Sequence, residues 1–156
     1  MEKKTVVVDI NTDDKIEGDD WDFTVNVQAI NNYLSANNAT GNYSCFIDRL
    51  EVEVDAETAI EHLEIRAIGL QTDNKFRPTD EGQHNLQKSN VLCRANFRGV
   101  NYITVERSFV GNVSLPFQDN LRFKLYDYTD SEPIVAGSFE THMRLIFKAQ
   151  EYKQKK

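Results

Sequence analysis

Apolar and polar residues alternate near the end of the chain, and this pattern predicts β-strands. Residues 121–126 read Leu-Arg-Phe-Lys-Leu-Tyr, and after a polar turn region the apolar positions of 139–147 are Phe139, Met143, Leu145 and Phe147. Successive side chains of a strand point to opposite faces, so a period of two indicates a strand that is buried on one side only. We therefore expect the chain to end as a β-hairpin in a sheet with one face in water.

Shorter runs with the same period occur along the rest of the chain. We expect strands at 5–10, 21–27, 45–54, 63–69, 91–97 and 102–109. In the third of these, the apolar positions shift by one residue between Ile47 and Leu50, which predicts a β-bulge near Asp48 and Arg49. Polar stretches predict loops at 31–42 and 71–89, and 55–61 fits either a short helical turn or a loop.

About eight strands, with no helical period over ten or more residues, predict an all-β protein. We expect a single domain over residues 1–156, built as an antiparallel β-sandwich, with a short basic tail at 150–156. A jelly roll is the favoured topology. An immunoglobulin-like sandwich is the alternative, although Trp21 precedes both Cys45 and Cys93 and so departs from the Cys, Trp, Cys order of that fold.

The composition is that of a globular protein, with 40% hydrophobic and 28% charged residues in a chain of 156. Apolar runs such as 6–8 are too short to span a membrane, and the first residues lack the pattern of a signal peptide, so we expect no secretion by that route. The net charge of −7 argues against binding of duplex nucleic acid by the folded body. We expect Cys45 and Cys93 to be buried free thiols, although the sequence leaves a disulfide between them open.

Metal-binding and catalytic patterns are weak. The acidic segment 13–22 has the oxygen ligands that Ca²⁺ prefers, but it lacks the EF-hand spacing and is better explained as a solvated loop. No nucleophile motif or phosphate-binding glycine loop occurs. Ligand-like spacing is absent among the histidines, which are His62, His84 and His142. We therefore expect no cofactor, no metal and no enzymatic activity.

Tyrosines and the basic tail are the remaining candidates for a functional role. Tyrosine side chains that are exposed serve as interface anchors or as platforms for sugars. The tail is either a frayed terminus or an arm that docks on another molecule. The candidate interface residues are Tyr33, Tyr43, Tyr126, Tyr128, Tyr152, Lys153, Lys155 and Lys156.

The segment 121–127, followed by Gly137 and the alternating run 139–147, resembles the end of jelly-roll capsid proteins from large icosahedral double-stranded DNA viruses. The resemblance implies a minor capsid or penton-type subunit that acts through contacts between subunits and needs no catalytic site. It further implies homo-oligomers, other capsid proteins as partners, assembly in a host cytoplasm and a place in the virion. Independently of the resemblance, the tyrosines and acidic loops leave open a carbohydrate- or ligand-binding β-sandwich.

Overall fold

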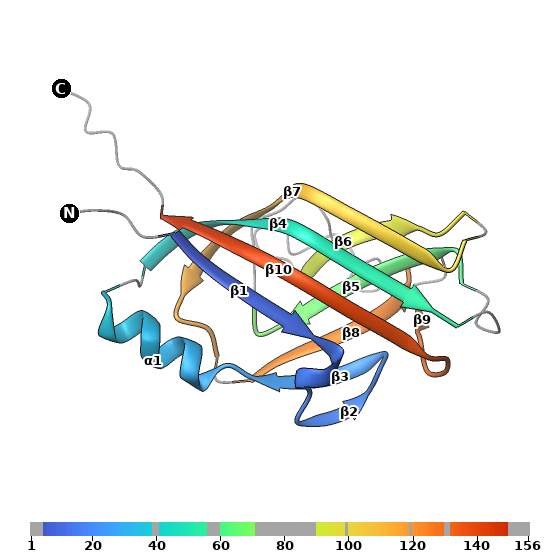
Figure 1. Ribbon diagram of the computed structural model, residues 1–156, viewed down its shortest axis with the longest axis horizontal. Helices are drawn as coiled ribbons and strands as arrows, with labels where there is room; N and C mark the ends of the chain where they lie inside the picture. Colours follow the sequence, from blue (N-terminus) through green and yellow to red (C-terminus); the bar gives the residue numbers. More distant parts are fainter. Residues whose placement is uncertain are drawn as a thin grey trace.

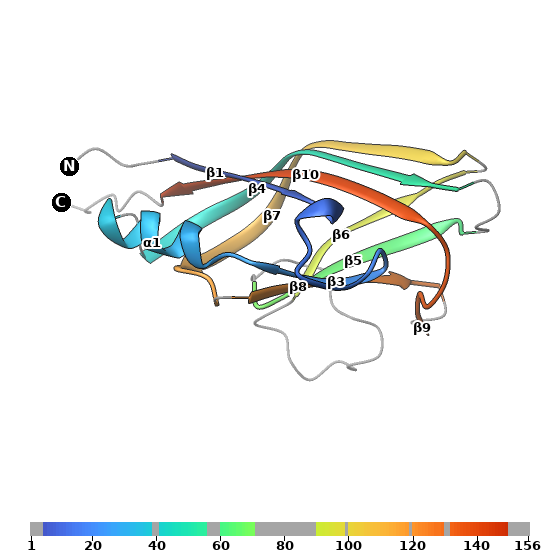
Figure 2. The ribbon, with the colours of Figure 1, turned by 60° about the horizontal axis from the view of Figure 1, so that its bottom comes forward.

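Two antiparallel β-sheets pack face to face in the computed structural model, which describes residues 5–38, 41–55, 60–70, 90–98, 100–118, 120–129 and 132–149 (Figures 1 and 2). One sheet has four strands in the order β1-β10-β4-β7, and the other has six, in the order β2-β3-β8-β5-β6 with β9 added beside β8. The expected antiparallel β-sandwich is thereby confirmed. The strands are β1 (Thr5–Asn11), β2 (Glu17–Asp19), β3 (Asp22–Asn26), β4 (Gly41–Val54), β5 (His62–Ile68), β6 (Val91–Asn96), β7 (Tyr102–Leu115), β8 (Asn120–Asp127), β9 (Glu132–Pro133) and β10 (Phe139–Ala149).

The first half of the chain pairs with the second half in four ladders. β1 pairs with β10 and β4 pairs with β7 in the four-stranded sheet, while β3 pairs with β8 and β5 pairs with β6 in the six-stranded sheet. The ladders are centred on nearly the same point of the sequence, since the midpoint of Asp22↔Lys124 is residue 73 and that of His62↔Asn96 is residue 79. Successive ladders therefore alternate between the two sheets as the chain is followed from its ends toward its middle.

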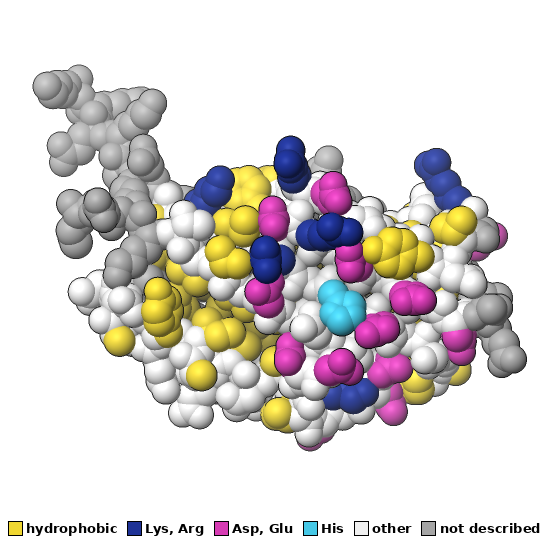
Figure 3. All heavy atoms as spheres, in the orientation of Figure 1, with side chains coloured by type: hydrophobic (Ala, Val, Ile, Leu, Met, Phe, Trp, Pro, Cys, Tyr) yellow, Lys and Arg dark blue, Asp and Glu magenta, His cyan; other side chains and the backbone are white. Residues whose placement is uncertain are grey.

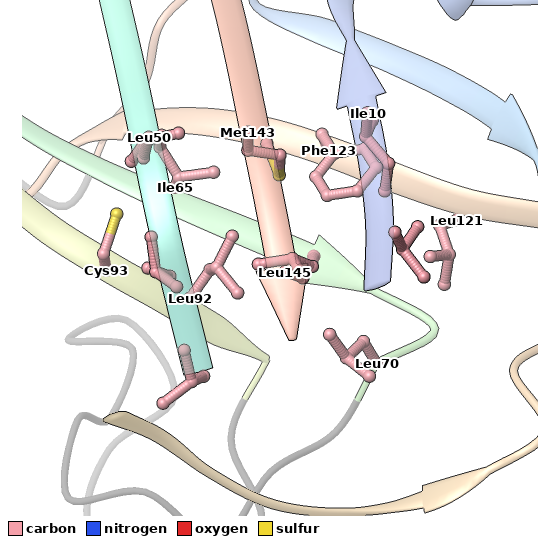
Figure 4. Packing of buried hydrophobic residues seen from close by; sticks show 14 of the residues in the cluster. Ile10, Leu50, Ile65, Leu70, Leu92, Cys93, Leu121, Phe123, Met143 and Leu145 are labelled. Carbon is pink, nitrogen blue, oxygen red and sulfur yellow. The ribbon is translucent and has the colours of Figure 1, made fainter. Parts of the chain in front are cut away.

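The inward-facing apolar side chains of both sheets form one core (Figure 4). Ile10, Leu50 and Met143 come from three strands of the four-stranded sheet and meet Ile65 and Phe123 of the six-stranded sheet. The alternation that predicted these strands is confirmed, because the alternating apolar positions are all at most 3% exposed: Leu121, Phe123, Leu125, Phe139, Met143, Leu145 and Phe147.

The bulge expected near Asp48 and Arg49 is present. In the β10·β4 ladder, Arg144 pairs with Arg49 and Leu145 pairs with Ile47, so Asp48 is the extra residue. The insertion keeps Ile47 and Leu50 on the same inner face although they are three residues apart, which is why both are fully buried.

The expected C-terminal hairpin is wrong. β8 lies in the six-stranded sheet between β3 and β5, whereas β10 lies in the four-stranded sheet between β1 and β4. The chain crosses from one sheet to the other between them, and the local partner of β8 among the described residues is the two-residue β9. Alternation shows which face of a strand is buried but carries no information about the strand beside it.

The expected loop at 31–42 is also wrong, because it contains most of a helix, α1 (Gln28–Ala36), and the start of β4. Val27, Ile30 and Leu34 follow helical spacing and place an apolar stripe against the core. The helix ends before Asn38, whose φ of 54° is the left-handed conformation common after a helix. A 3-10 turn, η1 (Thr12–Asp14), follows β1.

Two further expectations fall mostly outside the described residues, namely the surface excursion at 71–89 and the turn or loop at 55–61. Within the described part of the chain, no helix is long and apolar enough to cross a membrane.

Candidate interaction surface on the four-stranded sheet

An apolar row crosses the outer face of the four-stranded sheet from edge to edge. Val7 of β1 pairs with Ile146 of β10, Ile146 pairs with Phe46 of β4, and Phe46 pairs with Phe109 of β7. Directly paired residues of neighbouring strands point to the same face, so these four side chains form one line across all four strands. We call them the apolar row.

The apolar row is open to solvent, most of all at its two ends. Val7 is 53% exposed and Phe109 is 54% exposed. The rings of Phe46 and Phe109 lie 5.2 Å apart, and the Lys148 ammonium lies 5.3 Å from the centre of the Phe46 ring. A hollow of about 150 Å³ beside the row is lined by Phe46, Ile47, Asp48, Arg107, Ile146 and Lys148.

A row of charged residues runs parallel to the apolar row on the same outer face. On β1 and β10 it lies two residues away from the apolar row. Its members, in order across the sheet, are Asp9, Arg144, Arg49 and Glu106. Arg144 Nε donates to Asp9 Oδ1 at 2.8 Å, and this contact raises the pKa of Arg144 above its ordinary value. Arg49 makes an ion pair with Glu51 at 2.5 Å. The surface therefore combines an apolar line with fixed charges beside it.

A polar hollow of about 470 Å³ lies over this charged row and the residues next to it. Figure 3 shows the charged side chains around a histidine across the middle of this face, with apolar side chains gathered toward the end where α1 lies in Figure 1. His142 contacts Asn11 through Nδ1 at 2.9 Å and Glu140 through Nε2 at 3.1 Å. The residues lining the hollow are Asp9, Asn11, Asp48, Arg49, Glu51, His142, Met143 and Arg144, which include no Phe, Tyr or Trp.

An apolar groove of about 370 Å³ lies between helix α1 and β1, which is an edge strand of the sheet in the described part of the chain. It is lined by Thr5, Val6, Val7, Ala29, Ile30 and Tyr33. Val7 belongs both to this groove and to the apolar row, so the two form one continuous apolar surface. The groove is visible in Figure 3 as a hollow lined with hydrophobic side chains beside α1.

Asn31 holds the helix that forms one wall of this groove. Its Nδ2 donates to the carbonyl of Phe117 at 2.9 Å, and its Oδ1 accepts from the Phe117 N–H at 2.9 Å. The side-chain amide thereby pairs with a main-chain segment as a neighbouring strand would, which fixes α1 against the connection from β7 to β8.

The predicted tyrosines do not gather at one site. Tyr33 is exposed and lines the groove. Tyr43 and Tyr126, which were expected to be exposed, are only 3% and 7% exposed. Tyr43 points inward from β4, and Tyr126 lies under the guanidinium of Arg66.

Tyr128 is partly buried on the outer side of the six-stranded sheet. Its ring packs on His62 with 5.1 Å between ring centres, and its hydroxyl donates to Asn96 Oδ1. The four tail residues among the candidates lie outside the described residues; they are Tyr152, Lys153, Lys155 and Lys156.

The acidic segment 13–22 uses its carboxylates in separate contacts within the chain. Asp14 accepts from the Asn11 N–H at 2.8 Å, Asp20 pairs with Lys15 at 3.0 Å, and Asp22 pairs with Arg122. Among the residues that the structure describes, no group of three or more His, Cys, Asp or Glu side chains is placed to hold a metal ion.

The two cysteines are free and buried, as expected, so the structure does not join them in a disulfide. Burial raises the pKa of both Cys45 and Cys93 to about 12. Cys45 lies in β4 and Cys93 lies in β6, on opposite sheets of the sandwich.

The sequence contains a signal for the apolar row, but a search for alternation alone misses it. Three of its members are the middle residue of an apolar triplet, namely 6–8, 45–47 and 145–147. In a strand with one buried face, the outer two residues of such a triplet point inward and the middle one must point outward. Three triplets that align across neighbouring strands therefore indicate an exposed apolar line.

No protein-family model matches this chain, and a search of curated proteins gives no match to it.

Proposed function

We propose that this protein is a non-enzymatic structural subunit that assembles through the outer face of its four-stranded sheet, and that the assembly is a viral capsid in which it serves as a minor or penton-type protein. The observation that carries the proposal is the apolar row, which crosses the whole sheet and remains exposed in the single chain. Large exposed apolar patches in soluble proteins mark sites of interaction.

The strand pairing supports the capsid proposal at the level of topology. We infer that the two sheets form a jelly roll, because eight strands pair as four ladders that alternate between the sheets. The immunoglobulin-like alternative is disfavoured, since its first two strands share a sheet whereas β1 and β3 lie in different sheets. Jelly rolls are the fold of many capsid domains but also of lectins and cupins, so the topology alone does not select among them.

The chemistry of the outer face favours assembly over catalysis or sugar binding. A line of apolar side chains with a charged row beside it matches the anatomy of an interface, in which an apolar centre gives affinity and charges give register. The larger hollow on the same face has no Phe, Tyr or Trp side chain in its lining on which a sugar ring would stack.

The first experiment is to measure the mass of the purified protein by light scattering behind a sizing column, over a series of concentrations. We expect a closed oligomer, because a heterologous interface closes into a ring when its rotation allows. Phe109→Ser should raise the concentration needed for assembly by about tenfold, as expected for an interface anchor worth at least 1.4 kcal/mol.

Val135→Ser is the matched control, because Val135 is 73% exposed and lies outside the apolar row. A wild-type protein that stays monomeric at every concentration, and that does not enter particles with other capsid proteins, would contradict the proposed function. If Phe109→Ser and Val135→Ser need the same concentration for assembly, the apolar row is not the assembly surface.

The second candidate function is binding of a small polar ligand in the 470 Å³ hollow over Arg49, His142 and Arg144. Its volume lies in the range of small-molecule sites, and its lining offers both cationic donors and carboxylate acceptors. A thermal-shift screen with sugars, small anions and Ca²⁺ tests it. A ligand whose stabilisation disappears in Arg144→Gln supports this candidate, and an unchanged Tm with every ligand removes it.

A further inference from the structure

Two segments of the chain contain no charged residue, although 28% of the residues in the whole chain are charged. They are residues 23–47 and 108–118, from which Asp, Glu, Lys, Arg and His are all absent. The structure brings the two segments together, because the start of β4 pairs with the end of β7 and Asn31 of α1 is hydrogen-bonded to Phe117. We call the surface formed by their described residues the uncharged end.

The uncharged end exposes a helix and aromatic side chains. The exposed side of a surface helix normally carries charged and polar residues, but that of α1 has no charged side chain. In Figure 3, the side chains over α1 are yellow and white. Tyr33 of α1 and Phe109 of β7 are both more than half exposed. Few charged residues together with exposed aromatic ones are the composition of an interface core.

Phe109 and the 370 Å³ apolar groove lie on opposite sides of the four-stranded sheet. Phe109 belongs to β7, whereas the groove lies beside β1, at the other end of the strand order β1-β10-β4-β7. Three strand spacings, or about 14 Å, therefore separate Phe109 from Val7, which lines the groove. A chain cannot place Phe109 in its own groove across this distance.

We propose that the Phe109 side chain of one copy enters the groove between β1 and α1 of a second copy, so that the copies join head to tail. This inference rests on the proposed function and names the surface that receives the apolar row. In the groove, Phe109 meets the apolar side chains of Val7 and Ile30 and the ring of Tyr33. An apolar side chain that fits a pocket elsewhere on the same molecule makes a heterologous contact, which closes into a ring when its rotation allows.

The charge of the chain favours a second copy over a partner of opposite charge. At a net charge of −7, two copies repel each other wherever their acidic surfaces meet. A contact between uncharged surfaces avoids that repulsion, and it takes no charged group out of water. A basic partner would gain more from the exposed carboxylates of Asp13, Asp14 and Glu17, which lie outside the uncharged end.

Two variants block the two sides of the proposed contact separately. Phe109→Ser removes the side chain that enters the groove and leaves the groove intact. Ala29→Lys places a charged side chain at the groove and leaves Phe109 intact. Ala36→Lys is the matched control, because Ala36 is exposed on the same helix but is not among the residues that line the groove. Lysine is nearly as good a helix former as alanine, so circular dichroism should show both lysine variants folded.

Each blocking variant alone should need a concentration about tenfold higher than the wild type to assemble, as measured by light scattering behind a sizing column. Ala36→Lys should assemble like the wild type. An equimolar mixture of Phe109→Ser and Ala29→Lys should form a complex at the concentration at which the wild type assembles, because the Phe109 of one variant enters the intact groove of the other.

The mixed complex should stop at two chains, since its remaining groove is blocked and its remaining Phe109 position is a serine. An affinity tag on one variant shows by pull-down that the complex contains both. A mixture that stays monomeric where the wild type assembles would overturn the head-to-tail contact. An Ala29→Lys variant that assembles no worse than Ala36→Lys would also overturn it.

These two results leave the proposed function intact, because the wild type still assembles in both. The proposed function fails when the wild type itself stays monomeric at every concentration and does not enter particles with other capsid proteins. That result overturns the head-to-tail contact as well.

Discussion

Glu64 and Arg66 form an ion pair on the outer face of the six-stranded sheet, where Arg66 Nε donates to Glu64 Oε2 at 2.6 Å. Arg94 Nε donates to the other carboxylate oxygen at 2.7 Å. Glu64 is fully buried and Arg66 is 3% exposed. The guanidinium of Arg66 also stacks 3.5 Å above the centre of the Tyr126 ring. The middle of the outer face of β5, at Glu64 and Arg66, is therefore buried although it carries charged residues.

Glu64→Gln should lower the free energy of unfolding by about 3 kcal/mol, because it removes the charge that two guanidinium groups share in a buried position. The measurement is urea denaturation followed by fluorescence. Glu53→Gln, at an exposed position on β4, is the matched control and should change stability by no more than about 0.5 kcal/mol. Equal effects of the two substitutions would show that the buried pair does not stabilise the fold.

The sequence predicts the inner faces of the strands well and the outer faces poorly. Inner faces follow from apolar alternation, and even the bulge at Asp48 is readable as a shift of phase between Ile47 and Leu50. In β5, Glu64 and Arg66 alternate with apolar residues, a pattern typical of a strand with one face in water. Alternation separates polar from apolar positions, but it does not show that polar partners bury one another.

Local sequence patterns also do not predict which strands become neighbours or where a short helix forms. β8 and β10 look like a hairpin in the sequence, yet each pairs with strands from the first half of the chain. The asparagines of α1 make its sequence look like a loop, because asparagine favours loops over helices. In the folded chain, Asn31 gains two hydrogen bonds to Phe117 that a local pattern does not reveal. Tertiary contacts decide both cases.

Asn31→Ala should destabilise the protein by about 2 kcal/mol, because it leaves the N–H and carbonyl of Phe117 without their side-chain partner in a buried place. Thermal unfolding followed by circular dichroism measures the loss. Asn32→Ala, one residue along on the exposed side of α1, is the control and should be neutral or slightly stabilising, since alanine is the better helix former. A neutral Asn31→Ala would mean that the helix is held by its apolar stripe alone.

Thr141→Val should stabilise the protein by about 1 kcal/mol. Thr141 is fully buried, and its hydroxyl oxygen has no hydrogen-bond partner among the residues that the structure describes, so a methyl group of similar size removes an uncompensated polar atom. Thr12→Val is the matched opposite, because the Thr12 hydroxyl accepts from the Thr141 N–H at 2.8 Å and contacts the Thr141 carbonyl at 3.3 Å. We expect a higher Tm for the first variant and a lower Tm for the second, and a shift in the same direction for both would contradict this reasoning.

Both thiols should be inert in the folded protein at pH 8. Burial raises the pKa of Cys45 and Cys93 to about 12, and the reactive form of a thiol is the thiolate. Titration with a chromogenic disulfide reagent should detect no fast-reacting thiol in native protein and two after unfolding in guanidinium chloride. A thiol that reacts within seconds in native protein would show that one of the two sites opens to solvent.

Asp22 and Arg122 should contribute stability that depends on pH. Arg122 donates from Nε and Nη2 to the two Asp22 oxygens at 2.7 and 2.6 Å, and this pairing lowers the pKa of Asp22 below its ordinary value. A carboxylate with a lowered pKa in the folded state stabilises the fold above about pH 4, its value when unfolded, and loses that contribution as pH falls through the folded value.

Asp22→Asn should therefore cost about 0.5 kcal/mol at pH 7, a modest amount because the pair is open to solvent, and the cost should shrink toward zero as pH falls below 4. Urea denaturation at a series of pH values measures the difference. In an Arg122→Gln background, Asp22→Asn should have no such dependence on pH, because the guanidinium that lowers the pKa of Asp22 is gone. A cost that stays constant with pH in the wild-type background would show that Asp22 acts through hydrogen bonding or packing and not through its charge.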